Sequence, residues 1–272
     1  MKAMNNILVT TDFSFAASNA IEYAAKFAQK TNRNLTIANF KISEPASEPT
    51  VCRYIRETPD ILKEMSETIH KTYSIQCDYI VKRTNKSLEK TMETISSDLD
   101  LIVMGTNGAD DLYQYFLGSN AYHVVKRSKC PVLVVPENVS FESIERIVFA
   151  WDYTVDSKIA LSKLNELLKT NQAEITLLHI SRHITPVSDE LFEALKETVS
   201  TQLTDNKNIR FDKIFSKDPG NFSKKLLDYT EDLKANLLVT MYHERGIQNI
   251  FHGAITRKLS ETLNCPLLVL PI

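Results

Sequence analysis

Three of the six glycines of the chain fall in one window, residues 105–120, which reads GTNGADDLYQYFLGSN. Gly105, Gly108 and Gly118 follow the spacing Gly-x2-Gly-x9-Gly, and Ser119 comes directly after the last of them. Glycines let a backbone approach phosphate oxygens and adopt positive φ, and free N–H groups at a helix start favour anions. The pattern therefore indicates a phosphate-binding loop that leads into a helix. A simple turn explains one such glycine, but explains three together less well.

A carboxylate, Asp12, follows the first apolar run of the chain, residues 7–10. If the first and fourth strands are neighbours in a parallel sheet, Asp12 lies beside the glycine window, because ligands bind at the carboxyl ends of such strands. There it can accept a hydrogen bond from a ribose or a base. The window has no Lys or His to serve as a catalytic base, and it matches neither GxxxxGK[ST] nor GxGxxG. These residues favour nucleotide binding over catalysis.

The elements that must position these residues are short apolar runs that alternate with helical patterns. In the first half we expect strands at 6–11, 35–40, 76–82, 100–104 and 131–135, and helices at 16–30, 59–73, 86–97 and 118–128. In the second half we expect strands near 145–151, 174–180, 209–215, 236–241 and 266–270. Ser14 is a candidate cap for the first helix. Strands separated by helices predict parallel pairing with right-handed crossovers, and hence a doubly wound α/β fold.

The same plan occurs twice along the chain. The run ILVTTDFS at 7–14 returns as IVFAWDYT at 147–154, and CPVLVVP at 130–136 returns as CPLLVLP at 265–271. Between them, DLDLIVMG at 98–105 matches KANLLVTM at 234–241. Blocks that recur in the same order indicate an internal duplication. We therefore expect two tandem domains, 1–138 with the intact glycine window and 143–272 with a degenerate copy.

These motifs resemble the universal stress protein family, whose ATP-binding members carry Gly-x2-Gly-x9-Gly-Ser/Thr after the fourth strand. The resemblance extends to TDFS at 11–14, DLIVMGT at 100–106 and the closing CPVLVVP, and it covers both halves. It implies a Rossmann-like or flavodoxin-like α/β sandwich with a five-stranded parallel sheet in each domain. It also implies a tandem pair that acts as an intramolecular pseudo-dimer, and leaves open whether two such tandem chains form a homodimer.

The resemblance further implies that the first domain binds an adenine nucleotide, ATP or AMP, with Mg²⁺ as a candidate companion ion. The residues it implicates are Asp12, Gly105, Gly108, Gly118 and Ser119, with Thr10, Thr11, Phe40, Met104, Asn107 and Asn120 as further pocket residues. Two of these depart from the family pattern. Thr10 stands where many members have proline, and Asn120 stands where many have an apolar residue. Both departures concern details of the contacts at the edge of the pocket.

The matching window of the second half, MYHERGIQNIFHGAI at 241–255, lacks the glycine pattern. Met241 and Glu244 stand where the first half has glycines, and Ala254 stands where it has the serine. A glutamate about 4 Å from a phosphate in a partly exposed site costs on the order of a few kcal/mol. We therefore expect no ATP binding of the family kind in the second half, although Asp152 is retained. Since the same fold is expected without these glycines, folding alone is not expected to demand them in the first half.

A metal site is an alternative use of this second edge. Its candidate ligands are Asp152, His179, His243, Glu244 and His252. No compact ligand motif such as HExxH supports it, so a remodelled pocket or an interaction surface is the favoured interpretation. The sequence therefore predicts one nucleotide site, with no metal site and no catalytic residue.

Composition limits the remaining functions. Hydrophobic residues make up 43% of the chain, charged residues 24%, and the net charge is −2, which gives no basic footprint for nucleic acid. The N-terminal stretch lacks the apolar core of a signal peptide, and no apolar run is long enough to cross a membrane, so we expect a cytoplasmic protein. Its cysteines show no CxxC spacing and are expected to be free thiols (Cys52, Cys77, Cys130 and Cys265).

Three functional hypotheses follow from the sequence. The favoured one is a stress-response regulator that binds ATP or AMP in its first domain. The second is a weak ATPase or nucleotide-transforming enzyme on the same scaffold. The third is an interaction scaffold in which both pockets are vestigial.

Overall fold

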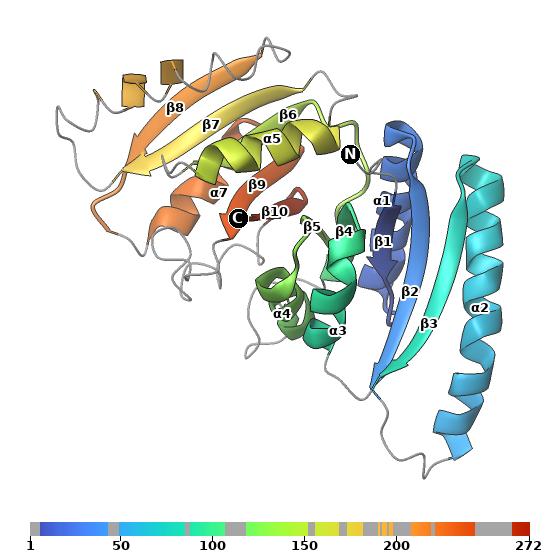
Figure 1. The fold of residues 1–272 in the computed structure, drawn as a ribbon. Helices are drawn as coiled ribbons and strands as arrows, with labels where there is room; N and C mark the ends of the chain where they lie inside the picture. Colours follow the sequence, from blue (N-terminus) through green and yellow to red (C-terminus); the bar gives the residue numbers. More distant parts are fainter. Residues whose placement is uncertain are drawn as a thin grey trace. The chain divides into compact units, whose positions relative to one another are not determined.

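The computed structural model describes residues 6–42, 49–84, 88–106, 118–151, 156–168, 173–181, 190, 192–194, 196–197, 208–218, 221–242 and 263–272. The chain divides into two compact units; in the described part the first ends at Phe141 and the second begins at Glu142. Figure 1 shows the elements of both units coloured along the sequence. No helix in the described ranges is both long and apolar enough to cross a membrane.

The first unit alternates strands and helices as the sequence predicts. Its elements are β1 (Asn6–Thr10), α1 (Phe15–Thr31), β2 (Asn34–Ile42), α2 (Pro49–Tyr73), β3 (Cys77–Thr84), α3 (Leu88–Ile95), the 3-10 turn η1 (Ser96–Asp98), β4 (Leu101–Thr106), α4 (Gly118–Arg127) and β5 (Val132–Pro136). The described strands lie in the order β3-β2-β1-β4-β5, and each neighbouring pair among them is parallel. The doubly wound α/β prediction is confirmed.

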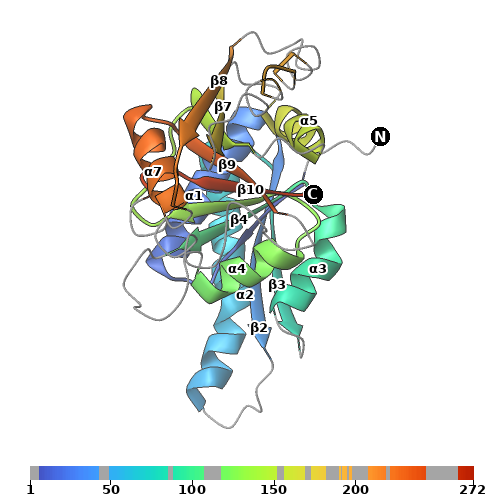
Figure 2. The same cartoon turned by 90° about the vertical axis from the view of Figure 1, so that its left-hand side faces the viewer.

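The helices of this unit cover the sheet in two pairs. Helix α1 contacts α2, and helix α3 contacts α4. Right-handed crossovers place these pairs on opposite faces of the sheet, because the chain reverses its direction of travel between β3 and β4. In Figures 1 and 2, α2 runs along β3 over most of the length of that strand. Both faces of the central strands β1 and β4 are therefore covered, which explains why their sequences are apolar throughout.

Helix α1 follows the predicted pattern closely. Its predicted inward face is buried (Ala17, Ala20, Ile21, Ala24, Phe27 and Ala28). Ser14 caps its start, since the Ser14 side chain accepts a hydrogen bond from the Ala17 N–H at 3.2 Å. The helix ends at Thr31, and its C-cap residue Asn32 adopts the left-handed conformation with φ 51°. Small alanines on the buried face let the helix lie close to β4 and β1.

Helix α2 is longer than the sequence prediction of 59–73. It begins at Pro49, so residues 49–58, which we expected in a connection, are helical. The sequence prediction begins the helix at Pro59, a residue type favoured in a first turn, yet the helix passes through it. Its buried residues form one stripe with helical spacing on both sides of Pro59, at Thr58, Leu62, Ser66 and Ile69. The tertiary contacts of that stripe outweigh the hydrogen bond lost at one proline.

The second unit repeats the plan with β6 (Arg146–Ala150), α5 (Asp156–Leu168), β7 (Glu174–Ser181), β8 (Ile209–Phe215), α7 (Phe222–Asp232), β9 (Leu237–Tyr242) and β10 (Leu267–Pro271). The described strands lie in the order β10-β9-β6-β7-β8, all in parallel pairs. With β6, β7, β8, β9 and β10 read as counterparts of β1 to β5, this is the same order as in the first unit.

The segment that follows β5 is fixed to α1. The Asn19 Nδ2 group donates to the carbonyl oxygens of Pro136 and Val139, both at 2.9 Å. Tyr23 packs edge-to-face on Phe141, with ring centroids 5.0 Å apart. The connection toward the second unit therefore leaves the first unit along α1.

Candidate functional site

The sheet order places the candidate site at a topological switch point. Strand β1 pairs on one side with β2 and on the other with β4, with Val9 opposite Val103. The connections that follow β1 and β4 cross the sheet on opposite faces, and in doubly wound folds ligands bind beyond the carboxyl ends of strands at such a point. Asp12 follows β1, and Gly105 lies near the end of β4. The neighbouring strands that the Asp12 hypothesis required are present.

The loop after β1 is built from its own side chains. The Thr11 hydroxyl accepts the Phe13 N–H at 3.0 Å, and the Asp12 Oδ1 accepts the Ser14 N–H at 3.0 Å. Ser14 in turn caps α1. Phe13 adopts φ 68°, a left-handed conformation that is uncommon for residues other than glycine. These local hydrogen bonds fix the conformation of the loop around Asp12, whose side chain is exposed.

The same loop is anchored to β2. The Thr11 N–H donates to the Ala38 carbonyl at 2.9 Å, and the Asn39 Nδ2 donates to the Thr11 carbonyl at 2.7 Å. Asn39 is 3% exposed, and within the described residues its Oδ1 accepts no hydrogen bond. A buried amide with one fixed donor positions the peptide that immediately precedes Asp12. Asn39 therefore acts as a positioning residue for the loop.

Gly105 has a packing role that the glycine pattern does not reveal. A Cβ atom at this position would lie 2.3 Å from the Ala16 carbonyl oxygen and 2.9 Å from the Ala17 nitrogen. Both are backbone atoms of the first turn of α1, which cannot move aside as a flexible side chain can. Our expectation that folding alone does not demand these glycines is therefore wrong for Gly105. Its φ is not in the left-handed range, so close approach, and not backbone conformation, is what requires glycine.

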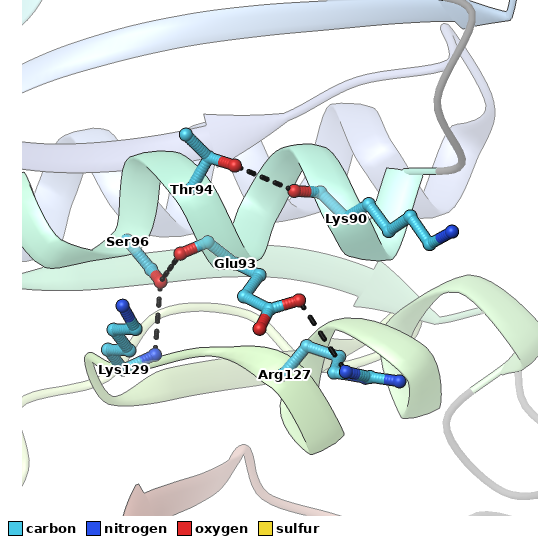
Figure 3. A network of polar contacts seen from close by, with 6 residues as sticks. All are labelled: Lys90, Glu93, Thr94, Ser96, Arg127 and Lys129. Carbon is cyan, nitrogen blue, oxygen red and sulfur yellow. Dashed lines mark hydrogen bonds and ion pairs between the residues drawn. The ribbon is translucent and has the colours of Figure 1, made fainter.

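Helix α4 is described from Gly118 onward, and Gly118 is the residue at which the sequence predicts a helix start. At its other end, α4 is tied to α3 and η1, as Figure 3 shows. Arg127 forms a 3.6 Å ion pair with Glu93, and the Lys129 N–H donates to the Ser96 hydroxyl at 3.0 Å. Arg127 also lies in the last turn of α4, where a cation complements the helix dipole. These contacts fix the direction of the helix that carries Gly118.

The remaining predicted residues are distributed around this edge. Thr10 and Phe40 are partly exposed at the ends of β1 and β2, whereas Met104 on β4 is buried. Ser119 and Asn120 lie in the first turn of α4. Asn107 and Gly108 lie outside the described residues. The structure thus brings Thr10, Thr11, Asp12, Met104 and Gly105 to neighbouring strand ends, with Phe40 on the next strand.

The equivalent edge of the second unit keeps the backbone contact and changes the side chains. The Trp151 N–H donates to the Leu178 carbonyl at 2.8 Å, as the Thr11 N–H does to Ala38. His179, the counterpart of Asn39, places its Nδ1 2.9 Å from the Trp151 carbonyl oxygen. Trp151 is buried and packs against Phe211 and Phe192, with centroids 5.8 and 6.3 Å away. An aromatic cluster replaces the small polar side chain of the first unit.

The other sequence features show no further site within the described residues. Among the described residues no group of three or more His, Cys, Asp or Glu could hold a metal ion. Four of the five candidate metal ligands of the second half lie outside those residues; His179 alone is described. Cys130 and Cys265 are buried at equivalent positions before proline, and burial raises the pKa of the Cys265 thiol to about 12. A thiol held in its neutral form is a poor nucleophile.

The fold and this edge define a tandem pair of doubly wound α/β units, with a polar loop at the switch point of the first. A profile of the universal stress protein family matches residues 4–136 and again residues 143–271. The chain therefore belongs to the universal stress protein family and carries the domain of that family twice, as the motif resemblance predicted.

Comparisons with individual proteins agree with this assignment. Proteins of Staphylococcus saprophyticus and Staphylococcus epidermidis that are named for the family are 29% and 30% identical over 145 and 144 residues. Each alignment covers 50% of this chain and 85% or 86% of the relative. The crystal structure of a universal stress protein from Archaeoglobus fulgidus covers 99% of both chains at 16% identity with a TM-score of 0.75. A Pseudomonas aeruginosa structure covers 99% of this chain and 94% of its own at 14% identity and TM-score 0.60.

Two features of the site could not be found from the sequence pattern alone. The role of Asn39 depends on a side-chain contact between neighbouring strands, and asparagine inside an apolar strand is the only available signal. The packing role of Gly105 depends on how closely α1 approaches β4. A useful signal for it is the run of alanines on α1, since small residues on one element favour close approach of another.

Proposed function

We propose that the first unit of this chain binds an adenine nucleotide, ATP or AMP, at the carboxyl ends of β1 and β4, and that the protein is a nucleotide-dependent regulator of a stress response. The observation that carries this proposal is the pre-formed loop at Thr11–Ser14, held beside the strand that leads into the glycine window. The Gly-x2-Gly-x9-Gly-Ser pattern of that window supports it independently.

Each element has a defined role in this proposal. Asp12 is exposed, and its Oδ1 is occupied by the Ser14 N–H, so its Oδ2 accepts a hydrogen bond from a ribose hydroxyl or a base amine. Phosphates bind at the start of α4, where N–H groups of the first turn, the helix dipole and the Ser119 hydroxyl favour an anion. Gly108 and Gly118 let the backbone approach the phosphate oxygens. Mg²⁺, when present, neutralises phosphate charge.

The second unit is proposed not to bind ATP in this manner. At the position that corresponds to Gly105, the second unit has Met241, and this residue is buried. It has Trp151 at the position of Thr11, which removes the hydroxyl that accepts the Phe13 N–H in the first unit. The expected stoichiometry is therefore one nucleotide per chain.

The test is isothermal titration of the full chain with ATP and AMP, together with mass spectrometry of the protein as purified. We expect a single site, and Gly118→Val should abolish it without changing the circular dichroism spectrum. Gly253→Val, the equivalent change in the second half, is the matched control and should leave binding intact. Retained affinity in Gly118→Val overturns the assigned site, and no binding of either nucleotide overturns the proposed function. A steady-state assay with added Mg²⁺ separates a regulator from a slow ATPase.

A further inference from the structure

Among the strands that the structure describes, β3 is an edge strand of the first unit. It comes first in the strand order and pairs with β2 along eight residues, from Leu35–Cys77 to Ile42–Thr84. Near its middle, Tyr79 is 38% exposed and Ile80 is 43% exposed. Successive residues of a strand point to opposite faces, so apolar surface is open on both faces of β3. An edge strand of this kind is a template for pairing with another strand.

The ladder between β2 and β3 determines which backbone groups face outward. The Leu35 N–H donates to the Gln76 carbonyl at 2.9 Å, while Leu35 lies opposite Cys77. In a parallel ladder the residues that bond to a given neighbour alternate along the strand. The even-numbered residues of β3 therefore bond to β2. The odd-numbered ones direct N–H and C=O away from the unit (Cys77, Tyr79, Val81 and Arg83).

This alternation limits how a second copy of β3 can pair with the first. In a symmetric antiparallel pair, the outward-facing residues of one copy must lie opposite outward-facing residues of the other. The two-fold axis must therefore lie between the two copies of one and the same residue. An axis at Ile80 places Tyr79 opposite Val81, and Asp78 opposite Lys82 of the second copy. An axis at Tyr79 or Val81 instead places Ile80 opposite a charged residue. Charge complementarity therefore selects the register centred on Ile80.

The side chains suit that register on both faces. Asp78, Ile80 and Lys82 share one face, so two ion pairs flank a contact between the two Ile80 side chains. They are non-hydrogen-bonded pairs, in which side chains approach most closely. On the other face, the aromatic Tyr79 meets the β-branched Val81, a favourable cross-strand combination. In the described part of the chain, neither Asp78 nor Lys82 forms an ion pair within the unit.

The equivalent strand of the second unit is protected against such pairing. By register, Asp212 of β8 holds the position of Ile80, and it accepts a hydrogen bond from the Tyr229 hydroxyl at 2.5 Å. Arg210, at the position of Asp78, is bonded to Glu174 at 2.9 Å. Charged side chains engaged within the unit are a common means of blocking an edge strand. Of these two strands, β3 is the one with an apolar centre flanked by opposite charges.

We propose that two copies of this chain associate through β3, in an antiparallel pair centred on Ile80, with Asp78 of each copy facing Lys82 of the other. The occupant of the edge is a second copy because the strand is complementary to itself in one register. Lysine on an edge strand often prevents association. Here Lys82 faces Asp78 of the other copy, so the charge favours this register over the others. This association is independent of nucleotide binding.

The test is sedimentation velocity of the full chain over a concentration series at low ionic strength. Wild-type protein is expected to shift from one chain to two. Asp78→Lys and Lys82→Asp should each weaken association by about tenfold or more, because each turns both ion pairs into repulsive pairs. The double variant should restore association, since it exchanges the two charges across the same axis. Nucleotide affinity, measured in the same samples, should not change.

A second pair of variants tests the apolar centre. Ile80→Asp copies the residue of the second unit and should abolish association. Ile159→Asp, a change at an exposed isoleucine of α5 in the second unit, is the matched control and should leave it unchanged. A chain that stays single at every concentration overturns the proposal. So does association that is insensitive to the single charge variants, or that the double variant fails to restore.

Discussion

The two units have sheets with the same strand order, but they carry different side chains at the carboxyl ends of the central strands. At three equivalent positions the first unit has Gly105, Thr11 and Asn39, and the second has Met241, Trp151 and His179. The backbone hydrogen bond from the residue after the first strand to the second strand is present in both. The side chains at the three positions around it differ. The frame of the site is thus a property of the fold, and its chemistry depends on these few side chains.

Gly105 shows why a shared frame can still diverge. Its position leaves no space for a Cβ atom beside the backbone of Ala16. The second unit has Met241 there, and Met241 is buried. The contact between the first helix and the fourth strand therefore cannot be the same in both units.

The largest expected effect comes from placing a first-unit residue in the second unit. Trp151→Thr removes a side chain that is 1% exposed and packs against Phe211 and Phe192. Loss of a buried aromatic of this size costs about 3–5 kcal/mol. Denaturation followed by far-UV circular dichroism should show one early transition for the second unit. Nucleotide affinity of the first unit should be unchanged at low denaturant; a parallel loss of affinity would contradict functional independence of the units.

Gly105→Ala is the corresponding test in the first unit, and its expected effect on stability is smaller. The added Cβ meets two backbone atoms of α1, and overpacking against backbone costs about 3 kcal/mol. Trp151 is the single tryptophan of the chain and lies in the second unit, so its emission reports the unfolding of that unit. The circular dichroism transition should therefore move to lower denaturant while the tryptophan transition stays in place. A circular dichroism midpoint equal to that of wild type would remove the packing role.

The exchange of Asn39 and His179 sharpens the comparison at the loop. Asn39→Leu leaves the buried Thr11 carbonyl without its side-chain donor and should cost about 1–2 kcal/mol. It should also weaken nucleotide binding, because the peptide before Asp12 is no longer fixed. Asn39→His keeps a ring N–H donor, as His179 provides in the second unit, and should recover most of both losses. Equal affinities for the leucine and histidine variants would show that the donor is not what matters.

Much of the fold follows from periodicity. The apolar runs at 6–11 and 100–104, the alanine face of α1 and the cap at Ser14 all appear as predicted, because each is a local pattern. The sequence prediction underestimates the length of helix α2, because proline is common in the first turn of a helix and Pro59 therefore predicts a helix start at that residue. The placement of Asp12 beside β4 is conditional on the first and fourth strands being neighbours, and these two strands are paired.

The site was less accessible to sequence reasoning, for a physical reason. Contacts between neighbouring strands, such as Asn39 with Thr11, join residues far apart in sequence and leave no periodic signal. The glycine pattern predicts where the site lies, but it does not tell why each glycine is needed. Close packing of backbone and close approach of a phosphate both require glycine. Comparison of the two units separates these causes, because the second unit shows which positions change together.

The smallest expected effect concerns the far end of α4. Glu93→Gln removes an ion pair with Arg127 whose atoms are 3.6 Å apart and whose side chains are 42% and 48% exposed. Surface pairs of this kind contribute less than about 1 kcal/mol, so thermal stability should barely change. Ser96→Ala removes the acceptor of the Lys129 N–H, which is partly buried, and should cost more. If the order of these two effects is reversed, the ion pair, and not the buried hydrogen bond, contributes more to the attachment of the far end of α4 to α3 and η1.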